Sequence, residues 1–242
     1  MVAFVACEKA ENGVQPENTV AKSSENPQAL TGKVTQIFRL DGVDVPEGTF
    51  ALDDPNRFIV LHQESMTLLI VNGFTSQEKY FQFGEGKGYD FRRAQKIEDH
   101  LSAYAESSGA IAEQEATGQI PKWWNQYAEN YISTNLRSSS LPVRSITTDL
   151  WTDKGANGRN YTMVSAARGF SQNPFLWLFG MSNNISSFHP FQVAYTAEYA
   201  YDKTWFRKRL FVHTRGFFTG AYTVDLSSGN EDRAESWLTL GL

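Results

Sequence analysis

Residues 201–213, Y-D-K-T-W-F-R-K-R-L-F-V-H, carry the clearest structural pattern in the second half of the chain. An aromatic residue opens it, a polar turn follows, and residues 210–213 leave the turn as an alternating strand. This pattern predicts a β-hairpin. Residues 150–164 follow the same order, with a turn rich in glycine and asparagine between two short runs. The second half therefore contains two hairpins of one design.

The two hairpins belong to an internal repeat with an offset of 49–50 residues. Such a repeat describes the architecture of a chain more directly than any single motif. The paired residues are Trp151 with Tyr201, Arg159 with Arg209, Tyr161 with Phe211, Trp177 with Leu226, Gly180 with Gly229, Ser187 with Ser236, and Phe188 with Trp237. No helical period of useful length follows Pro142. We therefore expect an all-β region made of two similar units.

Each copy closes with a polar segment that ends in serine. Residues 182–187 (arch 1) read S-N-N-I-S-S, and residues 231–236 (arch 2) read E-D-R-A-E-S. With these arches and hairpins, residues 145–242 resemble the βγ-crystallin family. A Greek key of that family opens with an aromatic residue, four residues, an aromatic residue, one residue and glycine. It closes with two Asn or Asp residues, two variable residues, Ser or Thr, and Ser.

The resemblance holds at some motif positions and fails at others. The matching residues are Trp151, Gly158, Tyr201, Phe206, Asn183, Ser186, Ser187, Asp232 and Ser236. The departures are Ala156 at an aromatic position, Lys208 at the glycine, Ser182 and Glu231 at the first arch position, and Glu235 at the Ser or Thr position.

The resemblance implies a double Greek-key sandwich over residues 142–242, packed face to face and able to fold alone. Its core would include Phe188, Trp237, Val164 and Phe211. In this family each closing arch can help to bind Ca²⁺, for which oxygen atoms are suitable ligands. The implied metal ligands are Asn183, Asn184, Ser186, Glu231, Asp232 and Glu235. The alternative is that these polar residues bond only the backbone of the arches, as Asn and Ser do in turns.

Residues 1–29 contain a residual signal and a tether. The run M-V-A-F-V-A precedes Cys7, the single cysteine, and resembles the cleavage site of a bacterial lipoprotein signal peptide. A full secretory signal has about 7–15 apolar residues behind a positive start, so we interpret this one as lacking its front. Lipidation at Cys7 would then attach the protein to a membrane through a polar, disordered segment, residues 8–29. The alternative is an ordinary N-terminus that carries a cysteine.

Residues 30–137 are predicted to form an α+β module. Strands are expected near residues 34–38, and a hairpin from Phe58–His62 and Met66–Val71, with Asn72-Gly73 as a break. An apolar stripe with spacings of 3, 3, 4 and 3 runs from Phe91 to Tyr104 and predicts a helix with Asp90 as its N-cap. A second helix is expected after Pro121.

Composition and motifs exclude several function classes. The net charge is −5 and no basic stripe occurs, so a nucleic-acid partner is not expected. Arg207, Lys208 and Arg209 read as a solvated hairpin edge, and Glu78, Glu98 and Glu106 read as solvated helix faces. The glycines at 84, 86 and 88 read as a loop between helices. No zinc spacing, catalytic elbow or dinucleotide fingerprint is present, so no catalytic residue is predicted.

Two adjacent tryptophans, Trp123 and Trp124, cannot both face one core from a helix, because neighbouring side chains point about 100° apart. One is expected to pack inside the protein, and the other to meet either a partner or the other domain, with the contact inside the protein favoured.

These features lead to one leading hypothesis of function. We expect a non-enzymatic protein of the bacterial cell envelope, lipid-tethered or secreted, with a binding or structural domain, an unidentified protein or surface partner, and weak Ca²⁺ binding. The alternative is a secreted protease inhibitor or antibacterial protein. A hydrolase in residues 30–137 is the least supported of the three.

Overall fold

The computed structural model describes residues 34–51, 54, 56–136, 147–155, 157–164, 170–173, 184–191, 196–216, 224–226 and 233–241. Within these residues the chain is a mixed α+β protein with two β-sheets and four helices. The strands are β1 (Thr35–Leu40), β2 (Val43–Val45), β3 (Phe58–Ser65), β4 (Leu68–Phe74), β5 (Thr147–Asp153), β6 (Asn157–Val164), β7 (Phe170–Asn173), β8 (Ser187–Phe191), β9 (Thr196–Lys203), β10 (Arg207–Arg215), β11 (Val224–Asp225) and β12 (Ser236–Gly241). The helices are α1 (Gln77–Lys87), α2 (Phe91–Ser107), α3 (Ala110–Thr117) and α4 (Lys122–Leu136). None of these helices has the length and apolar character needed to span a membrane.

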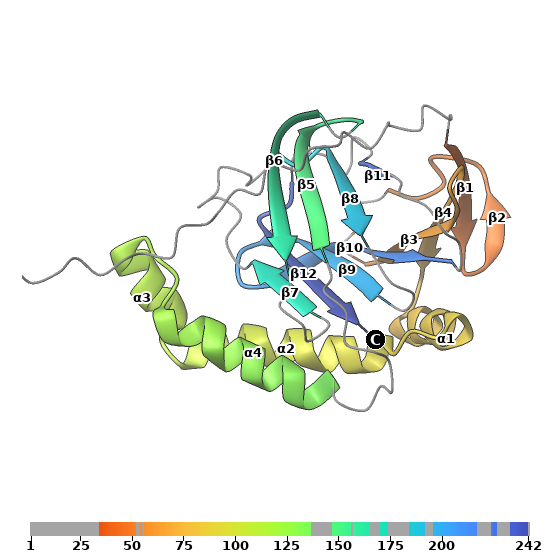
Figure 1. Cartoon of the computed structure of the whole chain (residues 1–242). Helices are drawn as coiled ribbons and strands as arrows, with labels where there is room; N and C mark the ends of the chain where they lie inside the picture. Colours follow the sequence, from red (N-terminus) through yellow and green to blue (C-terminus); the bar gives the residue numbers. More distant parts are fainter. Residues whose placement is uncertain are drawn as a thin grey trace, which may run out of the picture.

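The elements form three layers (Figure 1). The middle layer is an eight-stranded sheet in the order β2-β1-β4-β3-β10-β9-β12-β7. A four-stranded sheet, β11-β8-β5-β6, covers one face, and α2 and α4 run along the other (Figure 1). One apolar cluster joins the helices to the middle sheet and includes Trp124 and Tyr199. A second joins the two sheets and includes Phe188, Phe211 and Trp237, the described core residues expected from the repeat.

The last eight strands divide into two sets that exchange one strand. The first set, β5–β8, places β5, β6 and β8 in the four-stranded sheet, whereas its third strand, β7, pairs with β12. The second set, β9–β12, places β9, β10 and β12 in the middle sheet, whereas its third strand, β11, pairs with β8. The third strand of each set therefore lies beside the fourth strand of the other.

The middle sheet continues across the boundary expected between residues 30–137 and 142–242. Strand β3 pairs in parallel with β10, with Val60 opposite Val212 and His62 opposite Thr214. The division into two separately folding units stays a prediction. Residues on both sides of the boundary contribute to the middle sheet and to both apolar clusters, so the two parts share one sheet and one core on each of its faces.

The elements of residues 34–136 follow the expected order, with two corrections. Helix α2 begins at Phe91 as predicted, and Asp90 Oδ1 accepts a hydrogen bond from Arg93 N at 2.9 Å. Gly73, however, lies inside β4, since only a residue without Cβ fits against the ring of Phe50. Gly84 likewise lies inside α1, where it packs against the ring of Phe91. These glycines permit close packing and do not break the elements.

The paired tryptophans separate as expected. Trp124 is fully buried and meets Trp205 of the β9–β10 hairpin edge-on, with ring centroids 4.8 Å apart. Trp123 is 38% exposed, and its Nε1 donates to Glu113 at 3.2 Å. Trp124 thus fixes α4 to the β-rich half of the protein.

Candidate functional site

Equivalent serines tie each arch to its own hairpin. In the first set Ser187 Oγ donates to Asp153 O at 2.6 Å. In the second set Ser236 Oγ donates to Lys203 O at 2.8 Å. Because Ser187 and Ser236 were paired by the sequence repeat, and their acceptors are 50 residues apart, these bonds confirm this part of the repeat.

The backbone next to each serine repeats the same contact. Ser186 N donates to Trp151 O at 2.9 Å, and Glu235 N donates to Tyr201 O at 2.8 Å. The donors and the acceptors are again related by the repeat offset. Each arch is therefore held against the first strand of its set by one side-chain and one main-chain hydrogen bond.

The two hairpins also share left-handed backbone positions. Gly155 and Gly158 have φ angles of +69° and +75° in the first set. Their counterparts fifty residues later are Trp205 and Lys208, with φ angles of +59° and +53°. Glycine adopts this conformation without strain, whereas larger residues do so at a cost of about 1–2 kcal/mol each. The second hairpin therefore keeps the backbone shape of the first with less suitable residues.

The predicted calcium ligands are only partly within the described residues. Asn183, Glu231 and Asp232 lie outside them. Asn184 is exposed within arch 1, Ser186 is buried, and Glu235 is half-buried. Within the described part of the chain, no group of three or more His, Cys, Asp or Glu side chains is placed to hold a metal ion.

Two basic residues, Lys208 and Arg233 of arch 2, meet at one carboxylate. Arg233 Nη2 lies 2.9 Å from Asp202 Oδ2, and Lys208 Nζ pairs with the same oxygen. Desolvation raises the pKa of Asp202, but the hydrogen bonds from Lys208 and Arg233 outweigh it and hold this pKa below its usual value. Arg233 stands between two of the predicted ligands in the sequence. Its positive charge weakens the attraction of arch 2 for a cation.

A cleft of about 450 Å³ opens between α2 and the β9–β10 hairpin. Five basic and three acidic side chains line it, together with two glutamines, Ser102 and the ring of Phe58. Ser102 Oγ lies 2.9 Å from Trp205 O and 3.2 Å from Phe206 O, which fixes the hairpin tip to α2.

A buried ion pair forms the inner wall of this cleft. Arg209 Nη1 lies 3.2 Å from Glu98 Oε1 and 3.2 Å from the hydroxyl of Tyr80. Its guanidinium stands over the rings of Tyr80 and Phe58, at 4.9 and 5.7 Å from their centroids. Burial raises the pKa of Glu98, while the charge of Arg209 opposes this rise. The ion pair therefore joins β10 to α2 beside two aromatic rings.

Two sequence interpretations are wrong at this place. Glu98 is buried, not part of a solvated helix face, and Arg209 is only 14% exposed at its side chain, not part of a solvated edge. A signal for Glu98 was present, because it lies within the apolar stripe between Ala94 and Leu101 at spacings of 4 and 3. The partner of Glu98 could not be read from the sequence, since 111 residues separate the two charges.

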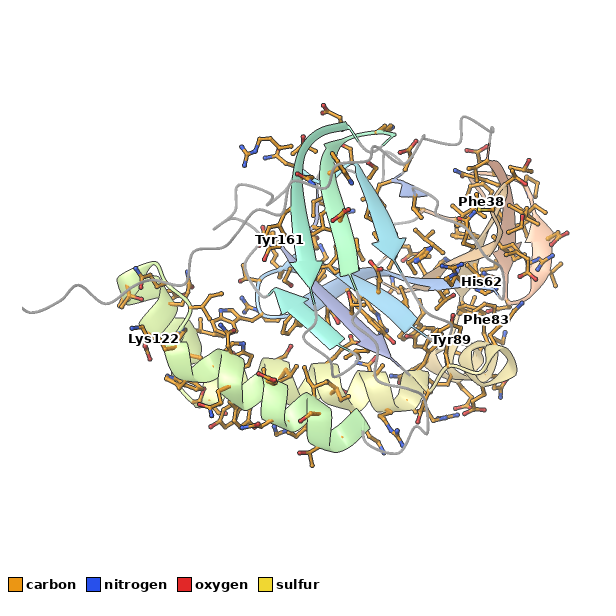
Figure 2. All side chains as sticks on the ribbon, viewed as in Figure 1. Phe38, His62, Phe83, Tyr89, Lys122 and Tyr161 are labelled. Atoms are coloured by element: carbon orange, nitrogen blue, oxygen red, sulfur yellow. The ribbon has the colours of Figure 1, made fainter. Side chains whose placement is uncertain are left out.

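A second polar cluster joins β3, β10 and α1. His62 Nδ1 lies 2.8 Å from Thr214 Oγ1, and His62 Nε2 lies 3.0 Å from Glu64 Oε2, which also pairs with Lys87 at 3.1 Å. Figure 2 shows His62 beside Phe83, whose ring it meets edge-on. A hydroxyl, an imidazole and a carboxylate in a row resemble a hydrolase triad. Thr214 is fully buried, however, so its hydroxyl cannot reach a substrate.

Comparisons with known proteins do not assign the chain to a family. No protein-family model matches it. No curated protein matches it either. The crystal structure of the N-terminal domain of protein S aligns with 41% of this chain and 98% of its own length, at 16% sequence identity and a TM-score of 0.24. A TM-score of this size does not establish a shared fold.

Proposed function

We propose that residues 142–242 form a βγ-crystallin-like double Greek key and that the protein has a binding or structural role in the bacterial envelope without catalysis. The observation that carries the proposal is the exchange of third strands between β5–β8 and β9–β12. Two four-stranded keys that exchange one strand bury a common core, which neither key could enclose alone. The paired serines Ser187 and Ser236 support the same arrangement.

The absence of a catalytic role is part of the proposal. The triad-like group of His62, Thr214 and Glu64 supports it, because its hydroxyl is buried inside the sheet junction. Buried hydrogen-bonded groups of this kind give a core one defined arrangement. We therefore interpret this cluster as structural.

We further propose weak Ca²⁺ binding at the arches. Arch 1 offers the neutral oxygens of Asn183, Asn184 and Ser186, and arch 2 offers Glu231, Asp232 and Glu235. Calcium affinity rises with ligand charge and with the rigidity of the site. The positive side chain of Arg233 within arch 2 reduces the charge available there. We expect a dissociation constant of about 10⁻⁴–10⁻³ M, the range of weak extracellular modules.

Calorimetric titration of the full chain, with Cys7→Ser to keep it free of lipid, tests the calcium site. The double variant Asp232→Asn, Glu235→Gln should lose the heat of binding, and Glu106→Gln, an exposed position on α2, should retain it. At a calcium concentration equal to the dissociation constant, stability should rise by about 0.4 kcal/mol. A dissociation constant below about 10⁻⁶ M would contradict a weak site. No heat and no melting shift at about 10 mM calcium would leave the arch residues with a backbone-bonding role only.

The membrane attachment through Cys7 is a separate proposal. The apolar run before Cys7 and the polar segment after it support lipidation. Expression in a bacterium, preceded by a complete signal peptide, should yield a mature N-terminus at Cys7 with the mass of a diacylglyceryl group. A mature protein with an unmodified Cys7 would contradict the tether.

A further inference from the structure

We propose that the cleft between α2 and the β9–β10 hairpin binds a small molecule through a phosphate or carboxylate group, with Arg207 and Arg209 as its anchors. This inference is independent of the calcium site and of the βγ-crystallin resemblance. It rests on Arg207, which has no ion-pair partner among the described residues, on the nitrogens of Arg209 that Glu98 does not contact, and on the way in which the hairpin is held.

Most of the basic side chains in the cleft are already neutralised. Arg57 Nε lies 2.9 Å from Asp54 Oδ2. Lys208 and Arg233 share Asp202. Arg207 differs from these, because its hydrogen bond within the described residues is to a main-chain oxygen, that of Thr204, at 3.2 Å. Both terminal nitrogens of its exposed guanidinium therefore stay available to a ligand.

Arg209 adds a second donor group beside Arg207. Only its Nη1 contacts Glu98 and Tyr80, so Nε and Nη2 have no partner among the described residues. Arg207 and Arg209 stand on either side of Lys208, whose φ angle is left-handed. Arg207 and Arg209 both line the cleft. Two guanidinium groups that line one cleft can together donate several hydrogen bonds to an oxyanion.

The hairpin tip is held in a strained conformation where it presents these arginines. Trp205, Phe206 and Lys208 have φ angles of +59°, +58° and +53°. Strain of this kind persists where the surrounding structure determines it, and it is concentrated at functional sites. Ser102 contacts the carbonyls of Trp205 and Phe206, and Ser236 Oγ accepts a hydrogen bond from Phe206 N at 3.2 Å. The anchors are therefore positioned before any ligand arrives.

The remaining lining of the cleft indicates the class of ligand. Its volume of about 450 Å³ is within the usual range for small-molecule sites. Gln77 and Gln95 add amide groups that can bond hydroxyls, and the half-buried ring of Phe58 adds an apolar wall. Glu98 and Asp99 disfavour a ligand that is anionic over its whole length. We infer a polar organic molecule with one anionic end, of the size of a sugar phosphate or a hydroxy acid.

The test uses the full chain with Cys7→Ser and two probes that each have a single anionic end, glycerol 3-phosphate and gluconate. Ionic strength is held constant, because screening alters every surface charge. Binding is followed by calorimetry and by the melting temperature. We expect dissociation constants of about 1 mM or lower for at least one probe. Arg207→Gln should weaken binding about tenfold or more, as the loss of charge-assisted hydrogen bonds implies.

The control is Arg159→Gln, an equal change of charge at an exposed position on β6 outside the cleft, which should bind as the unaltered protein does. Vesicles of phosphatidylglycerol provide a third arm. Loss of vesicle binding in Arg207→Gln, together with weak binding of both soluble probes, would identify a lipid headgroup as the source of the phosphate. Equal losses in Arg207→Gln and Arg159→Gln would overturn the proposal, as would the absence of binding to all three probes at about 20 mM.

Discussion

Lys208 occupies a backbone position that glycine holds in the first copy of the repeat. Its φ angle of +53° is one that a side chain disfavours, whereas Gly158 has the same backbone shape without this cost. The only described gain at Lys208 is its exposed ion pair with Asp202. Such pairs stabilise a protein by about 0.2–1 kcal/mol, less than the cost of a left-handed lysine.

We therefore predict that Lys208→Gly stabilises the protein by about 0.5–1 kcal/mol in urea unfolding. The matched variant Lys203→Gly lies on the same hairpin, in a strand with ordinary φ, and should destabilise by about 0.5–1 kcal/mol. Destabilisation of equal size in both variants would show that residue 208 is not left-handed.

Two buried histidines predict a dependence of stability on pH. Desolvation, assisted by the charge of Lys87, lowers the pKa of His62 to about 4. Desolvation also lowers the pKa of His213 well below its usual value. In the unfolded chain both have a pKa of about 6.5. Between pH 6.5 and 4 the unfolded chain therefore binds more protons than the folded protein. The contribution of the two neutral histidines to the free energy of unfolding is full above pH 6.5 and is lost as the pH falls.

For His62 alone the loss between pH 7 and pH 5 should be about 2 kcal/mol. Urea unfolding of the unaltered protein across this range measures it, and His62→Asn should reduce the slope by about one proton. Stability that stays constant from pH 7 to pH 5 would mean that both histidines are accessible to water in the folded protein.

At the scale of elements, the serine at the end of arch 2 joins three parts of the second key. Ser236 Oγ donates to Lys203 O and accepts from Phe206 N, which is buried. A buried donor without a partner costs about 1–3 kcal/mol. Ser236→Ala should therefore destabilise by this amount, whereas Ser107→Ala, on the exposed end of α2, should change stability by less than about 0.5 kcal/mol. If Ser236→Ala changed the stability as little as Ser107→Ala does, Ser236 would not bond the hairpin, and the position of arch 2 against it would be wrong.

Local patterns in the sequence predicted the helices and strands better than they predicted which elements contact one another. The helix from Phe91 and its cap Asp90 followed from spacing and chemistry that lie within a few residues. The break expected at Asn72-Gly73 was wrong, because Gly73 serves the packing of Phe50, a residue 23 positions away. The pairing of Glu98 with Arg209 and of β3 with β10 depends on contacts over more than 100 residues. No local pattern records such distances, so the cleft was not predicted.

At the scale of the whole molecule, the shared sheet changes what is expected of a truncated protein. Residues 142–242 alone would expose the edge of β10 and the helix-facing surface of Tyr199 and Trp205. An exposed apolar face and an open strand edge favour aggregation. Independent folding of residues 142–242, the expectation from the repeat, stays a prediction, and the shared sheet favours the opposite outcome.

We predict that residues 142–242 alone are soluble only in part and unfold at a urea concentration well below that of the full chain. Circular dichroism and urea titration of both proteins test this. Equal midpoints for the fragment and the full chain would show that β3 and the helices do not contribute to the stability of the β-rich half.

The exchange of third strands carries the proposed fold, and one cross-linking measurement tests it most directly. Ser171 of β7 lies opposite Thr239 of β12. Antiparallel partners have Cα atoms about 4.5–5.5 Å apart, a distance that a disulfide can bridge. In the Cys7→Ser background, the pair Ser171→Cys, Thr239→Cys should form a disulfide in the folded protein, detected by peptide mass without reduction. The pair Ser171→Cys, His189→Cys, which joins β7 to β8 of its own set, should not. A disulfide in the second pair and none in the first would contradict the exchange of strands.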